Sequence, residues 1–160
     1  MNTGNQSPNK GELKLTAKDQ FTGPHEVNQT EWISCAPFER LLNIEILEAE
    51  DGTAKLRMPF LYEYAQGAGL MHGGALVGLA DTAAVMAIKT ILPPHTHFAT
   101  IKMTAEYLKS VKSGYLTARA AAEALNDKEL KSAVSVYNEE KEIVLKFSAL
   151  FKRASKQKNG

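Results

Sequence analysis

The sequence predicts an α+β fold in which a curved antiparallel sheet of about six strands wraps round one long central helix. One apolar stretch, residues 71–88, is too long for a typical strand. Six shorter segments alternate apolar and polar residues, and most are separated by turns of a few residues. Strands joined by short turns pair antiparallel. The apolar face of such a sheet needs a covering layer, and the long helix is the element that can supply it.

The helix itself is predicted from residues 71–88, which are apolar on nearly every helical face, a pattern typical of a buried helix. It begins at His72-Gly73-Gly74, and Pro93-Pro94 ends it. A membrane span is the competing interpretation. From Gly73 to Ile88 there are 16 residues, short of the ~20 that a span needs, and an aspartate at mid-span would cost about 2.5–3.5 kcal/mol on insertion scales. We therefore expect no membrane as partner.

Two strands are expected before the helix. Residues 44–47 lead through the turn Glu50-Asp51-Gly52 into residues 53–58, and residues 60–70 form a loop that feeds the helix. Strict alternation in the second strand directs its apolar residues inward, and Pro59 ends it. These inward residues are Ala54, Leu56 and Met58.

Four alternating segments follow the helix, at residues 98–107, 115–125, 130–137 and 143–151. The turn-forming sequences between them are Lys112-Ser113-Gly114, Asn126-Asp127-Lys128 and Glu139-Glu140-Lys141. Alternation in the first of these segments places four residues on one face: Ile101, Met103, Ala105 and Tyr107.

The two ends of the sequence differ from the middle. Residues 1–24 are polar, predict a disordered or loosely attached segment, and lack the apolar core of a signal peptide. Residues 154–160 predict a solubilising tail. One domain is therefore expected at residues 25–153. It opens with a short helix near residues 31–42, capped by Thr30, that directs Trp32, Phe38 and Leu41 toward the core.

Composition limits the class of partner. A chain of 160 residues with 44% hydrophobic and 23% charged residues fits one globular domain, and a formal charge of +1 gives no sign of nucleic acid as a partner. The single cysteine, Cys35, excludes an intrachain disulfide and favours a cytoplasmic protein. His95 and His97 lack a third ligand at a fitting spacing, so we expect no metal and no cofactor.

Asp81 is the residue that points to chemistry, because it is a carboxylate in the middle of a helix that should be buried. Such a group is paired, is neutralised by a raised pKa, or meets a substrate. The same helix begins with Gly73-Gly74, where free backbone N–H groups and the helix dipole can hold an oxyanion. The alternative is structural: a tight entry turn, and an aspartate bonded to a neighbouring hydroxyl.

Geometry adds a constraint on how these two features combine. Asp81 lies eight residues after Gly73, about 12 Å along a helix, whereas a base and an oxyanion donor must both come within about 3 Å of the reacting centre. Two copies packed antiparallel satisfy this, with Asp81 of one facing the Gly73 amide of the other. We therefore expect an obligate homodimer. Assembly of two dimers into a homotetramer is a separate expectation, and the sequence does not choose its arrangement.

A series of motifs then resembles a known family, the hotdog-fold acyl-CoA thioesterases of the phenylacetyl-CoA thioesterase type. The likeness covers roughly residues 37–153 and follows the same order along the chain. Its motifs are Pro37-Phe38-Glu39-Arg40-Leu41-Leu42, His72-Gly73-Gly74, Leu79-Ala80-Asp81, Thr100-Ile101-Lys102-Met103 and Tyr107-Leu108-Lys109.

The resemblance implies hydrolysis of an acyl-CoA thioester, with an aryl or a short or medium-chain acyl group. It makes Asp81 the general base or nucleophile and the Gly73 amide the group that polarises the carbonyl. Gln66 would lie near that carbonyl or the attacking water, and Thr100 near the water. Many members carry Asn at the position of Gln66, which leaves the substrate open. Asn43 replaces the usual Gly at a helix end and still tolerates a left-handed conformation.

Other candidate residues have weaker support. His72 is placed with the catalytic set, although a histidine before a helix is more often a structural hydrogen-bond partner. Gly74 is a candidate contact for the substrate. Basic residues after the helix are candidates for the phosphates of CoA, chiefly Lys102, Lys109 and Lys112, with Arg119 and Lys131 beside them; solvated strand faces are the alternative for each.

Two other functions remain open at this stage. A non-catalytic acyl-CoA-binding module would need the same pocket without turnover. An acyl-thioester hydratase or dehydratase shares the fold, but its His-containing signatures are missing from the sequence.

Overall fold

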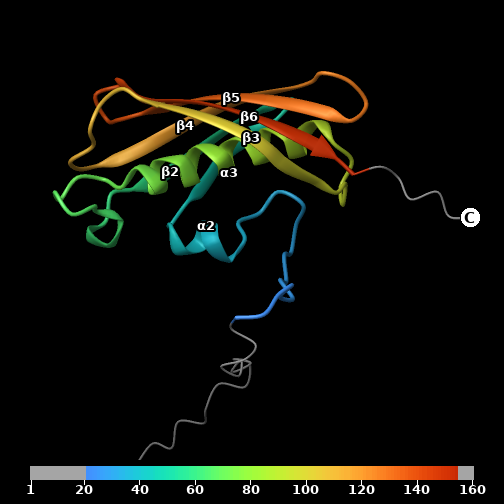
Figure 1. The fold of residues 1–160 in the computed structure, drawn as a ribbon, viewed down its shortest axis with the longest axis horizontal. Helices are drawn as coiled ribbons and strands as arrows, with labels where there is room; N and C mark the ends of the chain where they lie inside the picture. Colours follow the sequence, from blue (N-terminus) through green and yellow to red (C-terminus); the bar gives the residue numbers. More distant parts are fainter. Residues whose placement is uncertain (1–20, 155–160) are drawn as a thin grey trace, which may run out of the picture.

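A six-stranded antiparallel sheet lies over one long helix, and a short helix lies on the far side of that helix (Figure 1). This computed structural model describes residues 21–154; the predicted N-terminal segment up to residue 20 and the predicted tail from residue 155 lie outside the described residues. The elements are α2 (Pro37–Leu41), β1 (Glu45–Glu50), β2 (Thr53–Pro59), η1 (Tyr62–Tyr64), α3 (Gly73–Ile91), β3 (Phe98–Tyr107), β4 (Tyr115–Ala124), β5 (Glu129–Tyr137) and β6 (Ile143–Arg153).

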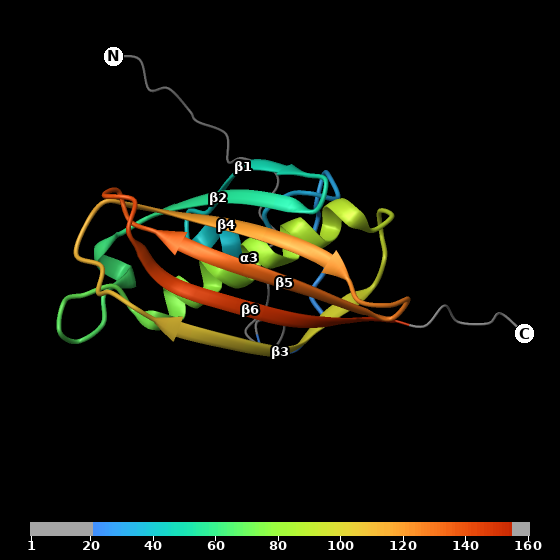
Figure 2. The same cartoon turned by 90° about the horizontal axis from the view of Figure 1, so that it is seen from above.

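The sheet has the strand order β1-β2-β4-β5-β6-β3, and every neighbouring pair is antiparallel. Seen from above, β1 and β3 are the two edges and α3 crosses behind the central strands (Figure 2). The predicted α+β fold of about six strands and one central helix is confirmed. Strand boundaries agree with the predicted ones to within three residues, and the boundary of a strand depends on pairing partners that the sequence does not show.

The core forms where the inner faces of β2, β4, β5 and β6 meet α3. In β2 the alternation is complete: the three predicted inward residues are at most 4% exposed. On α3, Leu79, Ala80, Ala83 and Ala84 are fully buried, so the helix can approach the sheet closely through small side chains. Only one side of α3 is fully buried, because the sheet lies against that side alone.

The turn between β1 and β2 shows why its residues are Asp and Gly. Asp51 and Gly52 both have positive φ, 45° and 80°, which is the requirement of a two-residue turn matched to the sheet twist. A Cβ at Gly52 would also lie 3.1 Å from the carbonyl oxygen of Ala122. Asn43 has φ 51° at the end of α2, so the predicted left-handed residue is confirmed.

The helix predicted at residues 31–42 is wrong in its extent. Thr30 caps no helix, and α2 begins only at Pro37, after an extended Ala36. Proline favours the first helical position because its φ is already helical. Phe38 and Leu41, predicted to face the core, are 57% and 70% exposed in the single chain. Trp32 is half-buried, and its indole N–H donates to the carbonyl of Lys89 at 3.0 Å.

The face predicted for β3 is interrupted by a β-bulge. The pairing with β6 shifts between Thr100 and Lys102, which leaves Ile101 as an extra residue. Thr100 pairs with Phe151 and Met103 with Ala149, both buried toward α3, so both sides of the bulge present residues to the helix. Ile101 and Met103 are nevertheless 51% and 47% exposed, because β3 is an edge strand that α3 scarcely covers.

Helix α3 has 19 residues and is long and apolar enough for a membrane span by length and composition alone. The 16 residues predicted from the sequence are therefore too few. More than half of the helix is buried against the rest of the protein, so α3 is the core helix of this fold.

Leu79→Ala should lower the free energy of unfolding by about 2–5 kcal/mol, because the side chain is fully buried between α3 and the sheet and its removal leaves a cavity. Denaturant unfolding measures this. Leu47→Ala is the matched control, since Leu47 is 42% exposed on β1 and should cost much less. Equal losses for the two variants would show that α3 does not organise the core.

Candidate functional site

The side of α3 that faces away from the sheet is only half-covered, and it carries Asp81. Val77, Gly78, Asp81 and Val85 lie along this side and are all half-buried. Helix α2 packs against it at Gly78, where an added Cβ would lie 3.0 Å from Leu42 Cδ1. Gly78 therefore allows the close approach of α2, and Asp81 lies one turn further along, where it stays only half-buried.

Thr100 is the nearest polar partner of Asp81. Its Oγ1 donates a hydrogen bond to Asp81 Oδ1 at 3.4 Å. Strict alternation would have turned Thr100 away from the face of Met103, and the bulge at Ile101 is what returns it to the helix side. Bulges re-aim side chains in this way near functional sites. Two residues 19 positions apart are thus brought together.

The environment raises the pKa of Asp81 above its ordinary value. The largest cause is burial, which disfavours the charged carboxylate, while the hydrogen bond from Thr100 lowers the pKa and the negative charge of Glu39 on α2 raises it. A carboxylate with a raised pKa is a stronger base than a solvated one, so Asp81 is suited to take a proton from water or an acid.

The start of α3 leaves one backbone donor unused. His72 is the N-cap: its Nδ1 accepts from the Gly74 N–H at 2.8 Å, and its carbonyl accepts from the N–H groups of Ala75 and Leu76. Within the part of the chain that the structure describes, the Gly73 N–H has no such acceptor. A free N–H at the positive end of a helix can hold an anion or an oxyanion. Gly74, in contrast, is occupied by the cap.

Tyr107 explains why residue 73 is a glycine. Its hydroxyl donates to the Gly73 carbonyl at 3.2 Å, and a Cβ at Gly73 would lie 3.0 Å from the tyrosine ring. The last residue of β3 thus packs directly on the first residue of α3. The sequence pattern placed Tyr107 only on a strand face, because nothing in the chain order links these two positions.

Gln66 lies in a tight turn that leads into α3. Its side-chain Oε1 accepts from the Ala68 N–H, and its carbonyl accepts from the N–H of Gly69, whose φ is 79°. Ala65 pairs with Met71 across this turn, and His72 donates to the Tyr64 carbonyl, which fix the turn beside the helix start. The amide Nε2 of Gln66 remains the group that can donate to a ligand.

These residues form two groups within one chain. Gly73, His72 and Gln66 gather at the start of α3, and Asp81 with Thr100 lies two turns further along. Eight residues of helix separate Gly73 from Asp81, about 12 Å. Within one chain, the predicted residues therefore form two separate groups, one at the start of α3 and one around Asp81, and not a single site.

The three candidate lysines are also divided. Lys109 and Lys112 lie in the loop after β3, which touches the helix start through the Met71 N–H and the Val111 carbonyl at 3.0 Å. Lys109 forms an exposed ion pair with Glu142 at 2.5 Å, and this contact lowers the pKa of the Glu142 carboxyl. Lys102 lies on the outer face of the sheet. The next residue along the strand, Met103, faces α3, and successive side chains of a strand point to opposite faces.

Glu39 is a further group that sequence reasoning left without a role. Its Oε2 is buried without a hydrogen-bond partner among the described residues, and its charge reaches Asp81. The sequence contains no signal for this proximity, since it depends on how α2 packs across α3.

The fold and the site together define a class. A six-stranded antiparallel sheet with one long helix against it, a carboxylate in that helix and a free amide at its start are the arrangement of a hotdog-fold hydrolase. Comparison with known proteins gives the family within that class.

Residues 68–145 match the family model of the thioesterase superfamily. The chain is 31% identical over 105 residues to the putative esterase ComA2 of Bacillus subtilis, covering 64% of this chain and 82% of that protein. It is 34% identical over 85 residues to the 1,4-dihydroxy-2-naphthoyl-CoA hydrolase of Listeria monocytogenes, covering 52% of this chain and 68% of that protein. The chain belongs to the thioesterase superfamily and is a thioester hydrolase.

Solved structures agree on the fold. A mutant of the phenylacetic acid degradation protein PaaI of Thermus thermophilus superposes with a TM-score of 0.68 at 25% identity, over 74% of this chain and 99% of that one. A hypothetical thioesterase of Streptococcus pneumoniae, solved with coenzyme A, superposes with a TM-score of 0.65 at 21% identity, over 71% and 87%. The predicted hotdog fold is confirmed.

Asp81→Asn should make the protein more stable than wild type at neutral pH. The pKa of Asp81 is raised in the folded state, so its contribution to stability is full below the pKa of the unfolded chain and is lost as the pH rises through the folded value. The neutral amide escapes this loss, and the advantage should shrink as the pH falls toward the ordinary carboxyl range. Denaturant unfolding at several pH values measures it.

Glu140→Gln, on the exposed turn between β5 and β6, is the matched control for loss of one carboxylate. If Asp81→Asn instead loses more stability than this control at neutral pH, the Asp81 carboxylate is a structural group and the argument for a base fails.

Proposed function

We propose that the protein hydrolyses an acyl-CoA thioester at a site built from two copies of the chain. Asp81 and Thr100 of one copy supply the base, and Gly73 and Gln66 of the second supply the donors. The observation that carries this is the unused Gly73 N–H, which is the right donor but lies about 12 Å from Asp81 within one chain. An antiparallel pair of α3 helices removes that separation and gives two equivalent sites.

The edge of the sheet supports this pairing. Strand β3 has one free side, and it exposes Ile101, Met103 and Tyr107, which are 51%, 47% and 54% accessible in the single chain. An exposed apolar edge strand is a template for pairing with another chain. Two β3 strands joined about a two-fold axis would cover these side chains and bring the two α3 helices side by side. Two such dimers would then form the proposed homotetramer.

In the proposed reaction, the Asp81 carboxylate takes a proton from a water that Thr100 helps to hold. The water oxygen attacks the thioester carbonyl carbon, and the oxyanion is held by the Gly73 N–H of the second copy, with Gln66 beside it. Collapse breaks the C–S bond, and the protonated Asp81 returns its proton to the leaving thiolate, giving the free acid and CoA. Attack by Asp81 itself is the variant, and it would place oxygen-18 from water in the Asp81 carboxyl during a single turnover.

His72 has a supporting part in this scheme. By capping Gly74 and carrying the next two amides on its carbonyl, it holds the first turn so that Gly73 alone is free to donate. This scheme gives the His72 ring no proton-transfer role. Gly74 would then line the substrate path through its backbone without donating to it.

The CoA moiety is proposed to run past the start of α3. Lys109 and Lys112 lie in the loop that touches this point, and the ion pair of Lys109 with Glu142 is exposed, so exchanging it for a phosphate costs little. Lys102 points to the other face of the sheet and is not included at this position. The Listeria relative is named for an aryl-CoA, which supports an aryl acyl group here; a short or medium-chain acyl group is the alternative within this proposal.

A cytoplasmic location is proposed with this function. Cys35 is half-buried, and burial raises the pKa of its thiol, which disfavours the reactive thiolate. A free buried thiol suits a reducing compartment.

Thiol release should be rapid for one class of acyl-CoA and should fall by about 10²-fold or more in Asp81→Asn, because the base is removed and the fold is kept. The panel is acetyl-, hexanoyl-, decanoyl-, palmitoyl-, benzoyl- and phenylacetyl-CoA. Asp127→Asn, on an exposed turn of the sheet, is the control. If Asp81→Asn turns over every substrate at the wild-type rate, Asp81 is not the base; tight binding of acyl-CoA without turnover would point to a binding module instead.

Mixing two inactive variants tests whether the site is shared. In a heterodimer of an Asp81→Asn chain with a Gln66→Ala chain, one site has both wild-type residues and the other has neither, so about half of the wild-type activity should return. If both residues act within one chain, no site is restored. A separated heterodimer with no activity above the two parents, or an active monomer by sedimentation, would contradict the shared site.

A further inference from the structure

The outer face of the sheet, opposite α3, carries a row of basic side chains. Lys55 on β2 pairs directly with Arg119 on β4, Arg119 with Ser135 on β5, and Ser135 with Lys146 on β6. Residues at one register position share a face, and the neighbours on either side in sequence, such as Val134 and Val136, are buried toward α3. The row therefore points away from α3 and Asp81.

Glu48 and Glu106 flank this row at its two ends, opposite Lys55 and Lys146, but Arg119 faces no carboxylate along it. Like charges directly opposite one another in a sheet are destabilising, and Lys55 faces Arg119. Lys55 reaches Glu48 at 3.4 Å. Within residues 21–154, Arg119 and Lys146 have no carboxylate at ion-pair distance. A local conflict of this kind is expected where a site is kept for an external partner, here an anion.

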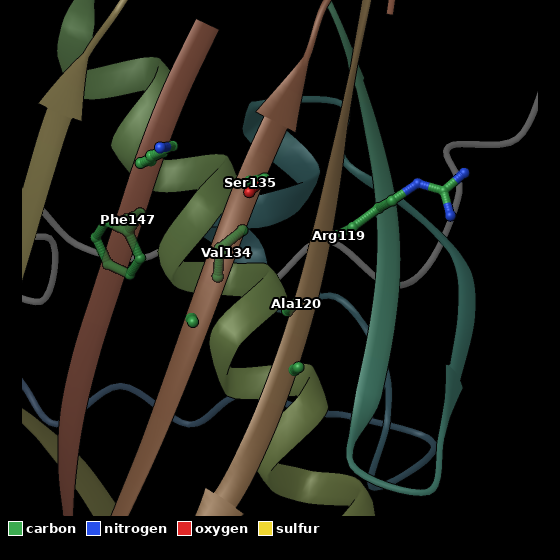
Figure 3. Close-up of a pocket in the computed structure, with 8 residues that line it drawn as sticks. Arg119, Ala120, Val134, Ser135 and Phe147 are labelled. Carbon is green, nitrogen blue, oxygen red and sulfur yellow. The ribbon is translucent and has the colours of Figure 1, made fainter. Parts of the chain in front are cut away.

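Two depressions meet at Arg119. The first, of about 390 Å³, has Ser135 and Lys146 at its rim and the small residues Ala121 and Ala133 in its floor. Figure 3 shows Ser135 between the strands that carry Phe147 and Arg119, with α3 behind the sheet. The second, of about 500 Å³, continues from Arg119 past Lys55. Both volumes fall within the range of about 300–1,000 Å³ typical of small-ligand pockets.

The two depressions differ in chemistry. The first offers a guanidinium, an ammonium and a hydroxyl, the groups that bind phosphate. The second adds the rings of Tyr115 and Tyr137, which are diagonal neighbours on β4 and β5 through Thr117. Arg57 already lies over the Tyr115 ring at 4.8 Å. Aromatic side chains beside a phosphate-binding group suit a ligand that carries a planar ring.

We propose that this outer face binds a nucleotide, with the phosphates on Arg119, Ser135 and Lys146 and the base against Tyr115 and Tyr137. The site is separate from the proposed hydrolase site, because the sheet lies between them. A nucleotide there would occupy the protein together with the acyl-CoA substrate.

Calorimetric titration with ADP tests the site. Wild type should bind ADP saturably, and Arg119→Gln and Lys146→Gln should each weaken binding by about tenfold or more, as loss of a hydrogen bond to a charged group does. Lys152→Gln is the matched control, a cation on the same face outside both depressions. Tyr137→Leu should weaken ADP while leaving pyrophosphate unchanged. Absence of saturable binding to wild type would overturn the proposal.

ADP also resembles part of CoA, so its position must be tested. If the outer face holds it, Lys109→Gln and Asp81→Asn bind ADP as wild type does, whatever becomes of their hydrolase activity. If Lys109→Gln loses ADP and Arg119→Gln keeps it, the nucleotide occupies the substrate path and the proposal is wrong. It is equally wrong if Arg119→Gln loses ADP only because the oligomer dissociates, which sedimentation would show.

Discussion

The burial of α3 by a single sheet is the constraint on which the rest of the structure depends. The helix is apolar on nearly every face, yet the sheet covers only one side of it, so Val77, Gly78, Asp81 and Val85 stay half-buried on the other. Helix α2 covers part of this side at Gly78 and leaves Asp81 accessible. A carboxylate placed there is desolvated enough to be a base and still open to a ligand. The remaining apolar surface is what a second copy of the chain would cover.

Hydrogen-bond satisfaction at the start of α3 determines which amide is available. Four N–H groups of a first helical turn have no partner within the helix. His72 accepts two of them, Gly74 on its ring and Ala75 on its carbonyl, while its own N–H donates to the Tyr64 carbonyl, and Gly73 is left. Tyr107 then excludes any side chain at Gly73 and fixes its carbonyl. The capping histidine and the tyrosine therefore act through the backbone, and in the proposed mechanism they would prepare a donor without touching the reacting atoms.

Patterns within one segment predicted most of the fold, and contacts between segments account for what was missed. Alternation in β2 and the positive φ of Asn43 followed from local chemistry. The bulge at Ile101 did not, because it arises from pairing with β6, and it alone returns Thr100 to Asp81. Helix α2 was placed too early since Pro37 outweighs the cap at Thr30. The separation of Gly73 from Asp81 followed from helix geometry alone, whereas the contact of Tyr107 with Gly73 needed the structure.

The net charge of +1 conceals a local cluster of each sign. Glu39 and Asp81 gather on the side of α3, while Lys55, Arg119 and Lys146 align on the outer face of the sheet. The proposed acyl-CoA substrate is polyanionic, so it would be repelled by the first set and would keep its phosphates away from Asp81 while its acyl end approaches. Lys109 and Lys112, at the start of α3, are placed to hold them at that distance. The outer cations, on the far side of the sheet, are not placed to do so, and for that reason the nucleotide proposed for them is a separate ligand.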